Sequence, residues 1–245
     1  NHIYGNTTEN RGVIGNSILR VFDLNCASVG LNERTLKAEG RKYKFVYGTF
    51  RDRVQGGLPI HMKLIFEDPT GKILGAQIIG RGEVDKRIDV IATAIGFGGT
   101  IQDLWENELA YSPIYSTTKD PTNLLASTAL NYLNGLMKKV SIPEIRKLVE
   151  LDSYFLDTRS KNAFERGHIK GAVNIPSKEL KERLDELPKD KRIYNDSYSV
   201  VRMLSQRGFE NVYYVDGNFE DLCLYEYYKD KLKRREPIVT EYRFV

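Results

Sequence analysis

The order of apolar and polar residues marks five extended stretches in the first half of the chain, as expected of short β-strands. These stretches are residues 17–22, 24–29, 43–49, 59–67 and 73–80. The last two are joined by Asp68-Pro69-Thr70-Gly71, which has the composition of a β-turn. Helices are expected at residues 32–39, at 84–97 and from Thr100 onward, after the break at Gly98-Gly99. This order predicts an α+β unit with a mostly antiparallel sheet.

A polar, kinked loop over residues 109–120 follows these elements and leads into another helix. Asp120 can cap that helix, and Pro121 stands where a missing N–H has no cost. Apolar residues then recur at helical spacing over 124–136. A braced loop that presents phenols outside the unit is therefore predicted. The two phenols belong to Tyr111 and Tyr115.

In the second half of the chain, strands alternate with helices. Ser141-Ile142-Pro143-Glu144 has the sequence of a capping box, so a helix is expected to begin there. Strands are expected at residues 154–157, 192–194 and 212–215. Helices are expected where Leu180, Leu184 and Leu187 recur, at residues 200–206 and around Leu222-Cys223-Leu224. This alternation predicts an α/β unit with a parallel sheet and helices on both faces.

Composition limits the function classes. A length of 245 residues suits one large or two ordinary domains, and a net charge of +4 is not the footprint of a nucleic-acid-binding protein. No apolar run is long enough to span a membrane and no signal peptide is evident. The cysteines, Cys26 and Cys223, share no metal or redox spacing, so no metal site and a reducing cytoplasm are expected. The chain begins with Asn1 rather than Met, and we expect it to be part of a longer polypeptide.

Several motifs occur in order along the first half of the chain. They are Val21-Phe22-Asp23-Leu24, Ala27-Ser28-Val29-Gly30-Leu31-Asn32-Glu33, Ile78-Ile79-Gly80, Ala110-Tyr111-Ser112-Pro113 and Lys119-Asp120-Pro121. Together they resemble the dimerisation domain of flavin-dependent pyridine nucleotide-disulfide oxidoreductases, in the branch of NADH oxidases and coenzyme A-disulfide or persulfide reductases. The resemblance implies that residues 1–12 are a remnant of a flavin domain and that residues 13–139 are the dimerisation domain of a homodimer.

This resemblance also implies a chemistry for the full-length parent protein. The parent is expected to be an enzyme that binds FAD and NAD(P)H and reduces a low-molecular-weight disulfide or persulfide, with coenzyme A disulfide as one candidate. No Gly-x-Gly-x-x-Gly follows a strand in this sequence, so we expect the fragment alone to bind neither cofactor and to be inactive. Two alternatives stay open: an NADH oxidase-type parent, and a non-enzymatic dimerising module that binds a partner.

Asp157, Gly167-His168-Ile169 and Asn174-Ile175-Pro176 resemble a single rhodanese domain, which implies such a domain at residues 140–233 and a solvated tail at 234–245. Active rhodaneses carry Cys-x-x-Gly-x-Arg-Ser after the fourth strand. The corresponding loop is about two residues shorter here, and it lacks the Cys, the Gly and the Arg. It consists of Asn195, Asp196, Ser197, Tyr198 and Ser199. Asp196 would repel an anion, so no sulfur transfer is expected.

The resemblance assigns candidate site residues in the first unit. Tyr115 would act as the general acid at the partner subunit's flavin-thiolate centre, and Tyr111 is the second catalytic candidate. Lys119 and His61 are the substrate-binding candidates, although an exposed lysine and a structural strand histidine are the commoner roles at such positions. The resembling reductases carry Tyr-Tyr-Pro-Gly before the Pro-Ile-His strand, whereas this chain carries residues 53–56, Arg-Val-Gln-Gly.

Overall fold

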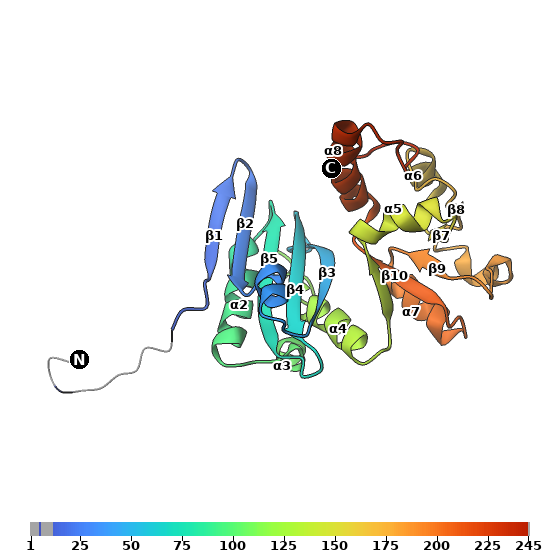
Figure 1. The fold of residues 1–245 in the computed structure, drawn as a ribbon. Coiled ribbons are helices and arrows are strands. Elements are labelled where there is room, and N and C mark those ends of the chain that lie inside the picture. Colours follow the sequence, from blue (N-terminus) through green and yellow to red (C-terminus); the bar gives the residue numbers. More distant parts are fainter. Residues whose placement is uncertain (1–4, 6–11, 245) are drawn as a thin grey trace. The chain divides into compact units, whose positions relative to one another are not determined.

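The protein is described from a computed structural model, which describes residue 5 and residues 12–244. The expected flavin-domain remnant at residues 1–12 therefore lies almost wholly outside the described residues. The chain forms two compact units that divide between Leu133 and Asn134 (Figure 1). We expected the boundary after residue 139. It lies earlier because the strand that begins at Lys138 pairs within the second sheet.

The first unit is built on a five-stranded antiparallel sheet with the order β1-β2-β5-β4-β3. Its strands are β1 (Ser17–Val21), β2 (Leu24–Gly30), β3 (Tyr43–Arg51), β4 (Pro59–Glu67) and β5 (Ile73–Gly80). All five were predicted from the apolar pattern. The long β3–β4 and β4–β5 pairings place alternate residues on one face, so Met62, Leu64 and Ile78 are buried while Gln77 and Ile79 are exposed.

Helices pack on both faces of this sheet. The main core lies under α2 (Val84–Gly96), α3 (Ile101–Glu106) and α4 (Pro121–Leu133), whereas α1 (Glu33–Ala38) packs through Leu36 against Ile65 and Leu74 in a separate cluster. Ile88 and Ile91 of α2 and Leu125 and Ala129 of α4 join the sheet residues in the main hydrophobic core. The helix expected to run to Leu136 ends at Leu133, because Asn134-Gly135 follows with Gly135 at a φ of +70°, and Leu136 is 51% exposed.

The second unit is built on a five-stranded parallel sheet with the order β6-β10-β9-β7-β8. Its strands are β6 (Lys138–Ser141), β7 (Tyr154–Asp157), β8 (Val173–Asn174), β9 (Ile193–Asn195) and β10 (Val212–Asp216). Its helices are α5 (Ile142–Glu150), α6 (Lys161–Glu165), α7 (Tyr198–Gln206) and α8 (Phe219–Lys233). In Figure 1, α5 and α8 lie on one side of the sheet and α7 on the other, which confirms the predicted α/β architecture.

Two expectations for the second unit are corrected. The leucines at 180, 184 and 187 do not lie on one α-helix. They lie along two 3₁₀ turns, η2 (Leu180–Glu182) and η3 (Leu184–Glu186), which bury Leu180 and Leu187 before Pro188 ends the run. The tail is not solvated: Ile238 and Val239 are buried, and the backbone N–H of Thr240 donates to the His168 carbonyl at 2.9 Å. Two adjacent β-branched residues near the end of the chain provide the apolar surface that holds it there.

Candidate functional site

The loop between α3 and α4 carries the two candidate phenols. The Ser112 carbonyl accepts hydrogen bonds from the backbone N–H groups of Tyr115, at 2.8 Å, and of Ser116, at 2.9 Å, which closes a tight turn. Tyr115 is 61% exposed and Tyr111 is 49% exposed. The loop therefore presents both phenols to the surroundings of the unit instead of burying them, and their catalytic roles stay predictions.

A second loop, between β3 and β4, lies directly against the tyrosine loop. The backbone N–H of Gln55 donates to the Pro113 carbonyl at 2.9 Å, and that of Val54 donates to the Ser116 carbonyl at 3.3 Å. The segment that stands in place of the Tyr-Tyr-Pro-Gly run thus contacts the loop that bears Tyr115.

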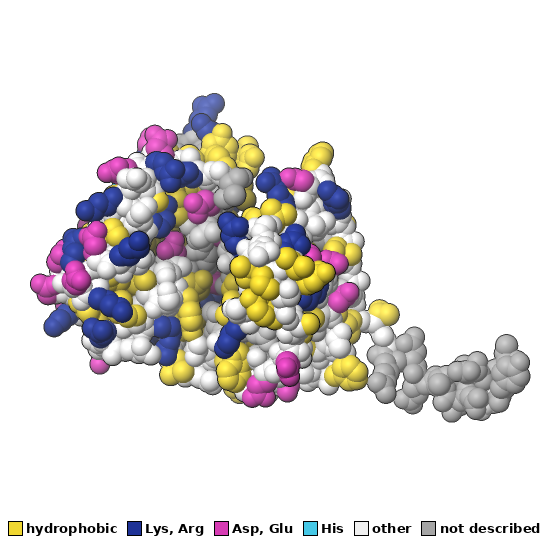
Figure 2. Space-filling view, turned by 180° about the vertical axis from the view of Figure 1, so that it is seen from behind, with side chains coloured by type: hydrophobic (Ala, Val, Ile, Leu, Met, Phe, Trp, Pro, Cys, Tyr) yellow, Lys and Arg dark blue, Asp and Glu magenta, His cyan; other side chains and the backbone are white. Residues whose placement is uncertain are grey.

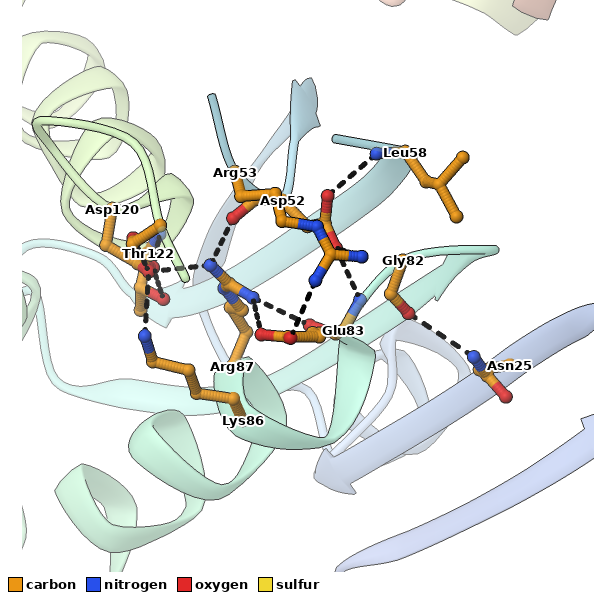
Figure 3. Close-up of polar contacts among 11 residues, drawn as sticks. Asn25, Asp52, Arg53, Leu58, Gly82, Glu83, Lys86, Arg87, Asp120 and Thr122 are labelled. Atoms are coloured by element: carbon orange, nitrogen blue, oxygen red, sulfur yellow. Dashed lines mark hydrogen bonds and ion pairs between the residues drawn. The ribbon is translucent and has the colours of Figure 1, made fainter. Parts of the chain in front are cut away.

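Arg87 of α2 is fully buried, and Figure 3 shows its polar contacts. Its Nη2 donates to the Asp52 carbonyl at 2.6 Å and to Asp120 Oδ2 at 3.0 Å. Its Nη1 donates to the Glu83 carbonyl at 3.1 Å and lies 3.4 Å from the Glu83 carboxylate. One guanidinium therefore joins the first turn of α2, the start of the β3–β4 loop and the end of the tyrosine loop.

Asp120 links this arginine to the tyrosine loop and to α4. Its Oδ2 accepts from the Ser116 hydroxyl at 2.9 Å, and its Oδ1 accepts from the backbone N–H of Thr122 at 3.0 Å, which confirms the predicted cap. Burial acts to raise the pKa of Asp120, but the Thr122 amide, the charge of Arg87 and the Thr122 and Ser116 hydroxyls outweigh it and lower this pKa. The carboxylate is thus held ionised between the loop and the helix.

Asp52 completes the group of buried charges from the other side. Its Oδ1 accepts from the Leu58 backbone N–H at 2.7 Å, and its Oδ2 accepts from the Glu83 backbone N–H at 3.0 Å, at the start of α2 (Figure 3). A Cβ at Gly82 would lie 2.8 Å from that carboxylate, so the close approach requires glycine. Arg53, which is partly exposed, pairs with Glu83 at 3.1 Å.

The two substrate-binding candidates, Lys119 and His61, lie in different structural settings. Lys119 is exposed, and its carbonyl accepts from the Thr117 hydroxyl at 2.6 Å. His61 lies on β4, where its Nδ1 is 3.1 Å from the Thr49 hydroxyl on β3. Because its neighbours Ile60 and Met62 are buried against the helices, His61 points to the opposite face of the sheet. The structure thus places Lys119 in the tyrosine loop and His61 on the sheet, and both substrate-binding roles stay predictions.

In the second unit, the loop that follows β9 is a two-residue turn. Asn195 belongs to the strand, and α7 begins at Tyr198, so only Asp196 and Ser197 connect them. Asn195 is buried. Its Nδ2 donates to the Leu156 carbonyl at 2.6 Å, and its Oδ1 accepts from the Ser197 backbone N–H at 2.8 Å. The Ser197 amide, one that an open loop would offer to an anion, is thereby occupied within the turn.

A cavity of about 30 Å³ opens beside this turn, at the carboxyl ends of the strands. Asp157, Asp196, Asn218 and Phe219 are among the residues that line it. It has room for about a water molecule or two. Burial, and then the charge of Asp157, raise the pKa of Asp196 to about 6, although the charge of Arg159 acts against them. The cavity is thus small and mostly apolar, and a carboxylate at Asp196 is unfavourable for a sulfur-bearing anion beside it.

The cysteines provide no substitute nucleophile at this cavity. Cys223 is fully buried in the core of the second unit, and burial raises the pKa of its thiol. Cys26 lies half-buried on β2. Over residue 5 and residues 12–244, no group of three or more His, Cys, Asp and Glu side chains could hold a metal ion.

The surface carries charges of both signs. Figure 2 shows basic and acidic side chains interspersed over the face that it presents, in keeping with the small net charge. In the described part of the chain, no helix combines the length and the apolar character needed to cross a bilayer.

Sequence reasoning missed Arg87 and Asp52. A signal for Arg87 was present, because residues 84, 87, 88 and 91 have the i, i+3, i+4, i+7 spacing of a buried helical stripe. The arginine interrupts this stripe of Val84, Ile88 and Ile91, so its burial could have been read from its position. The partners of Arg87 lie 33 and 35 residues away, at Asp120 and Asp52, and no local pattern identifies them.

Comparison with known proteins supports both halves of the sequence interpretation. The chain is 37% identical over 122 residues to a coenzyme A disulfide reductase of Staphylococcus epidermidis, a match that covers 49% of this chain and 27% of that protein. The solved structure of reduced Bacillus anthracis CoADR-RHD is 41% identical with a TM-score of 0.85, over 90% of this chain and 41% of that one. A NAD-dependent persulfide reductase from A. fulgidus is 38% identical with a TM-score of 0.81, over 89% of this chain and 41% of that one.

The chain thus spans well under half the length of these relatives. Two family matches agree with the two units. Residues 17–121 match the dimerisation domain of pyridine nucleotide-disulphide oxidoreductases, and residues 141–224 match the rhodanese-like domain. The first unit is therefore similar to the dimerisation domain of the pyridine nucleotide-disulphide oxidoreductases, and the same polypeptide joins it to a unit that matches the rhodanese-like domain.

Proposed function

We propose that this chain is part of an FAD- and NAD(P)H-dependent reductase of low-molecular-weight disulfides or persulfides. In this proposal, the first unit forms a homodimer and supplies Tyr115 to the partner subunit's reaction centre. The observation that carries the proposal is an exposed phenol on a loop held by buried charges, in a domain whose relatives include coenzyme A disulfide and persulfide reductases. Coenzyme A disulfide is the first substrate to test.

The antiparallel sheet of the first unit offers no βαβ turn for a dinucleotide. We therefore assign FAD and NAD(P)H to the remainder of the parent protein, and we derive no step through them.

The chain's own contribution would be a proton. When a disulfide or persulfide is reduced, the departing thiolate sulfur must take up a proton, and the phenol O–H can donate it from Oη. The transfer requires the phenol within hydrogen-bond reach of the sulfur, directly or through one water. A turn closed by the Ser112 carbonyl and anchored through Ser116 would hold Tyr115 at such a distance.

Tyr115→Phe in the full-length parent tests this assignment, because it removes the hydroxyl and retains the ring. We expect disulfide reduction to slow on the order of a hundredfold, the contribution of a positioned general acid. Tyr228→Phe, at a phenol of the second unit that is 62% exposed, is the matched control, since it tests whether any lost phenol has this effect. Light scattering should show that both variants remain dimers. An unchanged rate for Tyr115→Phe on every disulfide and persulfide tried would refute the assignment.

For the second unit, we propose a binding role without sulfur transfer. The turn after β9 contains no cysteine, and its cavity is lined by Asp157 and Asp196. Thiosulfate should therefore give no thiocyanate with cyanide. Turnover above background that is lost in Ser197→Ala would contradict this. A cysteine-containing loop of the usual rhodanese length, grafted between Tyr194 and Val200, is the matched gain-of-function variant.

A further inference from the structure

Only one part of the tyrosine loop is buried. Residues 113–115 are exposed, with Ile114 at 49% and Tyr115 at 61% exposure. The next residue, Ser116, is buried at 1% exposure, and so is Asp120 at 4%. Burial of apolar surface, the hydrophobic effect, therefore does little to hold the phenol in place. The position of Tyr115 depends on what holds Ser116.

Ser116 is held by a chain of polar contacts that starts in α2. Its hydroxyl donates to Asp120 Oδ2 at 2.9 Å, and the same oxygen accepts from Arg87 Nη2 at 3.0 Å. Arg87 Nη2 also donates to the Asp52 carbonyl at 2.6 Å, at the start of the loop whose Val54 donates back to the Ser116 carbonyl. The contacts form a closed circuit through both loops.

We propose that Arg87 is a positioning residue for Tyr115. It would act through Asp120 and Ser116 to fix the phenol relative to the β3–β4 loop. The inference rests on the proposed function, since it gives the buried arginine a role in placing the proton donor. It assigns a role to a residue that contacts neither the phenol nor any group that the phenol would protonate.

A purely stabilising role explains the arginine less well. A buried ion pair gains little over apolar residues of similar size, because the desolvation of both charges offsets their attraction. Within the described part of the chain, Arg87 Nε has no hydrogen-bond partner although it is buried, which is a further cost. The geometry of the guanidinium explains why an arginine stands here despite this cost. Its forked N–H groups reach three segments at once, which the single ammonium of a lysine cannot do.

The first experiment measures loop order in this chain, by amide hydrogen exchange and by quenching of its single tryptophan. Trp105 is 40% exposed and lines a surface pocket with Ser116 and Thr117, so its emission reports on the loop. Ser116→Ala removes the hydrogen bond from the Ser116 hydroxyl to Asp120 and leaves the ion pair of Arg87 and Asp120 in place. We expect the amides of Tyr115 and Ser116 to exchange at least about tenfold faster in Ser116→Ala and in Arg87→Met, with β4 unchanged.

Leu36→Ala is the matched control, because Leu36 is fully buried in the same unit but in a separate core cluster with Ile65 and Leu74. This control should lower stability and leave the loop amides as protected as in the natural sequence. If Ser116→Ala leaves the loop amides as protected as in the natural sequence, or if Leu36→Ala frees them equally, the inference fails. Should Arg87→Met not fold, Arg87→Lys and Ser116→Ala decide the question.

The second experiment is a double-mutant cycle in the full-length parent, with coenzyme A disulfide as the probe substrate. A misplaced phenol should slow reduction by up to about a hundredfold in Ser116→Ala, and Ser116→Ala should cost nothing more in a Tyr115→Phe background. A merely structural role would give independent, multiplicative effects and would overturn the inference. If Tyr115→Phe alone leaves the rate intact, the proposed function fails. Faster loop exchange at an unchanged Ser116→Ala rate overturns only the positioning role.

Discussion

Replacement of Asp196 with asparagine should make the second unit more stable at neutral pH. The carboxylate of Asp196 faces a small cavity beside Asp157, and burial, followed by the charge of Asp157, raises its pKa from 3.8 to about 6 even though Arg159 lies near. At neutral pH the folded protein therefore holds an unfavourably placed charge. Asparagine has the same shape as the neutral acid and lacks that charge.

The expected gain follows from the difference between the folded and unfolded pKa values. Each unit of difference corresponds to about 1.4 kcal/mol, so a rise from 3.8 to about 6 corresponds to about 3 kcal/mol at most. The folded pKa is the higher one, so the folded state binds the proton more tightly. The contribution of Asp196 to stability is thus most favourable below about pH 4, becomes less favourable as the pH rises toward 6, and stays unfavourable above it. Asp196→Asn should lack this decrease.

The assay must report on the second unit alone. Cys223 is fully buried there, so the rate at which its thiol is labelled in urea measures the opening of that unit. Comparison of the two proteins at each pH removes the pH dependence of the labelling chemistry. Emission of Trp105 reports on the first unit, which should not change. Asp190→Asn, at an exposed position of the same unit, is the matched control.

We expect the two proteins to coincide at about pH 4 and Asp196→Asn to be the more stable at neutral pH, by up to about 3 kcal/mol. An equal gain at both pH values would mean that packing, not charge, is responsible. No gain at neutral pH would show that Asp196 is not held in an unfavourable environment. Either result would refute our description of the Asp196 carboxylate as unfavourable for an anion at this cavity.

Two further predictions concern the first unit. The contacts of Asp120 outweigh its burial and lower its pKa in the folded state. The stability that this carboxylate contributes is therefore present above the ordinary aspartate pKa and is lost as the pH falls through the lower folded pKa. Asp120→Asn should remove this acid dependence from an unfolding titration followed by Trp105 emission. Leu125→Ala, at a fully buried position of α4, should lower the free energy of unfolding by about 2–5 kcal/mol in urea.

The elements that sequence predicts well here are those with a local cause. The strands of the first sheet follow from apolar patterning and from turns of known composition. The helix starts follow from side-chain caps: Asn32 accepts from the Thr35 backbone N–H at 3.0 Å, and Thr100 and Ser141 form capping boxes with Asp103 and Glu144. In each case the bond that fixes the boundary joins residues only three apart.

The features that sequence misses depend on distant partners. The tail looks solvated because its own composition is charged, yet Val239 forms a bridge with Ile169, seventy residues earlier. The leucines at 180, 184 and 187 have helical spacing, yet the backbone takes 3₁₀ turns that let Leu180 and Leu187 reach the core. Local spacing decides which residues can be buried, and the rest of the fold decides the backbone path that buries them.

In the candidate site, too, the residues with a local sequence signal are predicted and those that depend on distant partners are missed. Tyr111, Tyr115 and Lys119 stand out in the sequence because a polar loop between helices is where function is concentrated, and the structure places all three in that loop. The residues that hold the loop are buried and distributed over three segments, so their composition gives no local pattern. Arg87 alone leaves a trace, as a charge within an apolar stripe. A charged residue on the buried stripe of a helix needs a partner of opposite charge. That partner, Asp120, lies 33 residues away, and the sequence alone does not single it out.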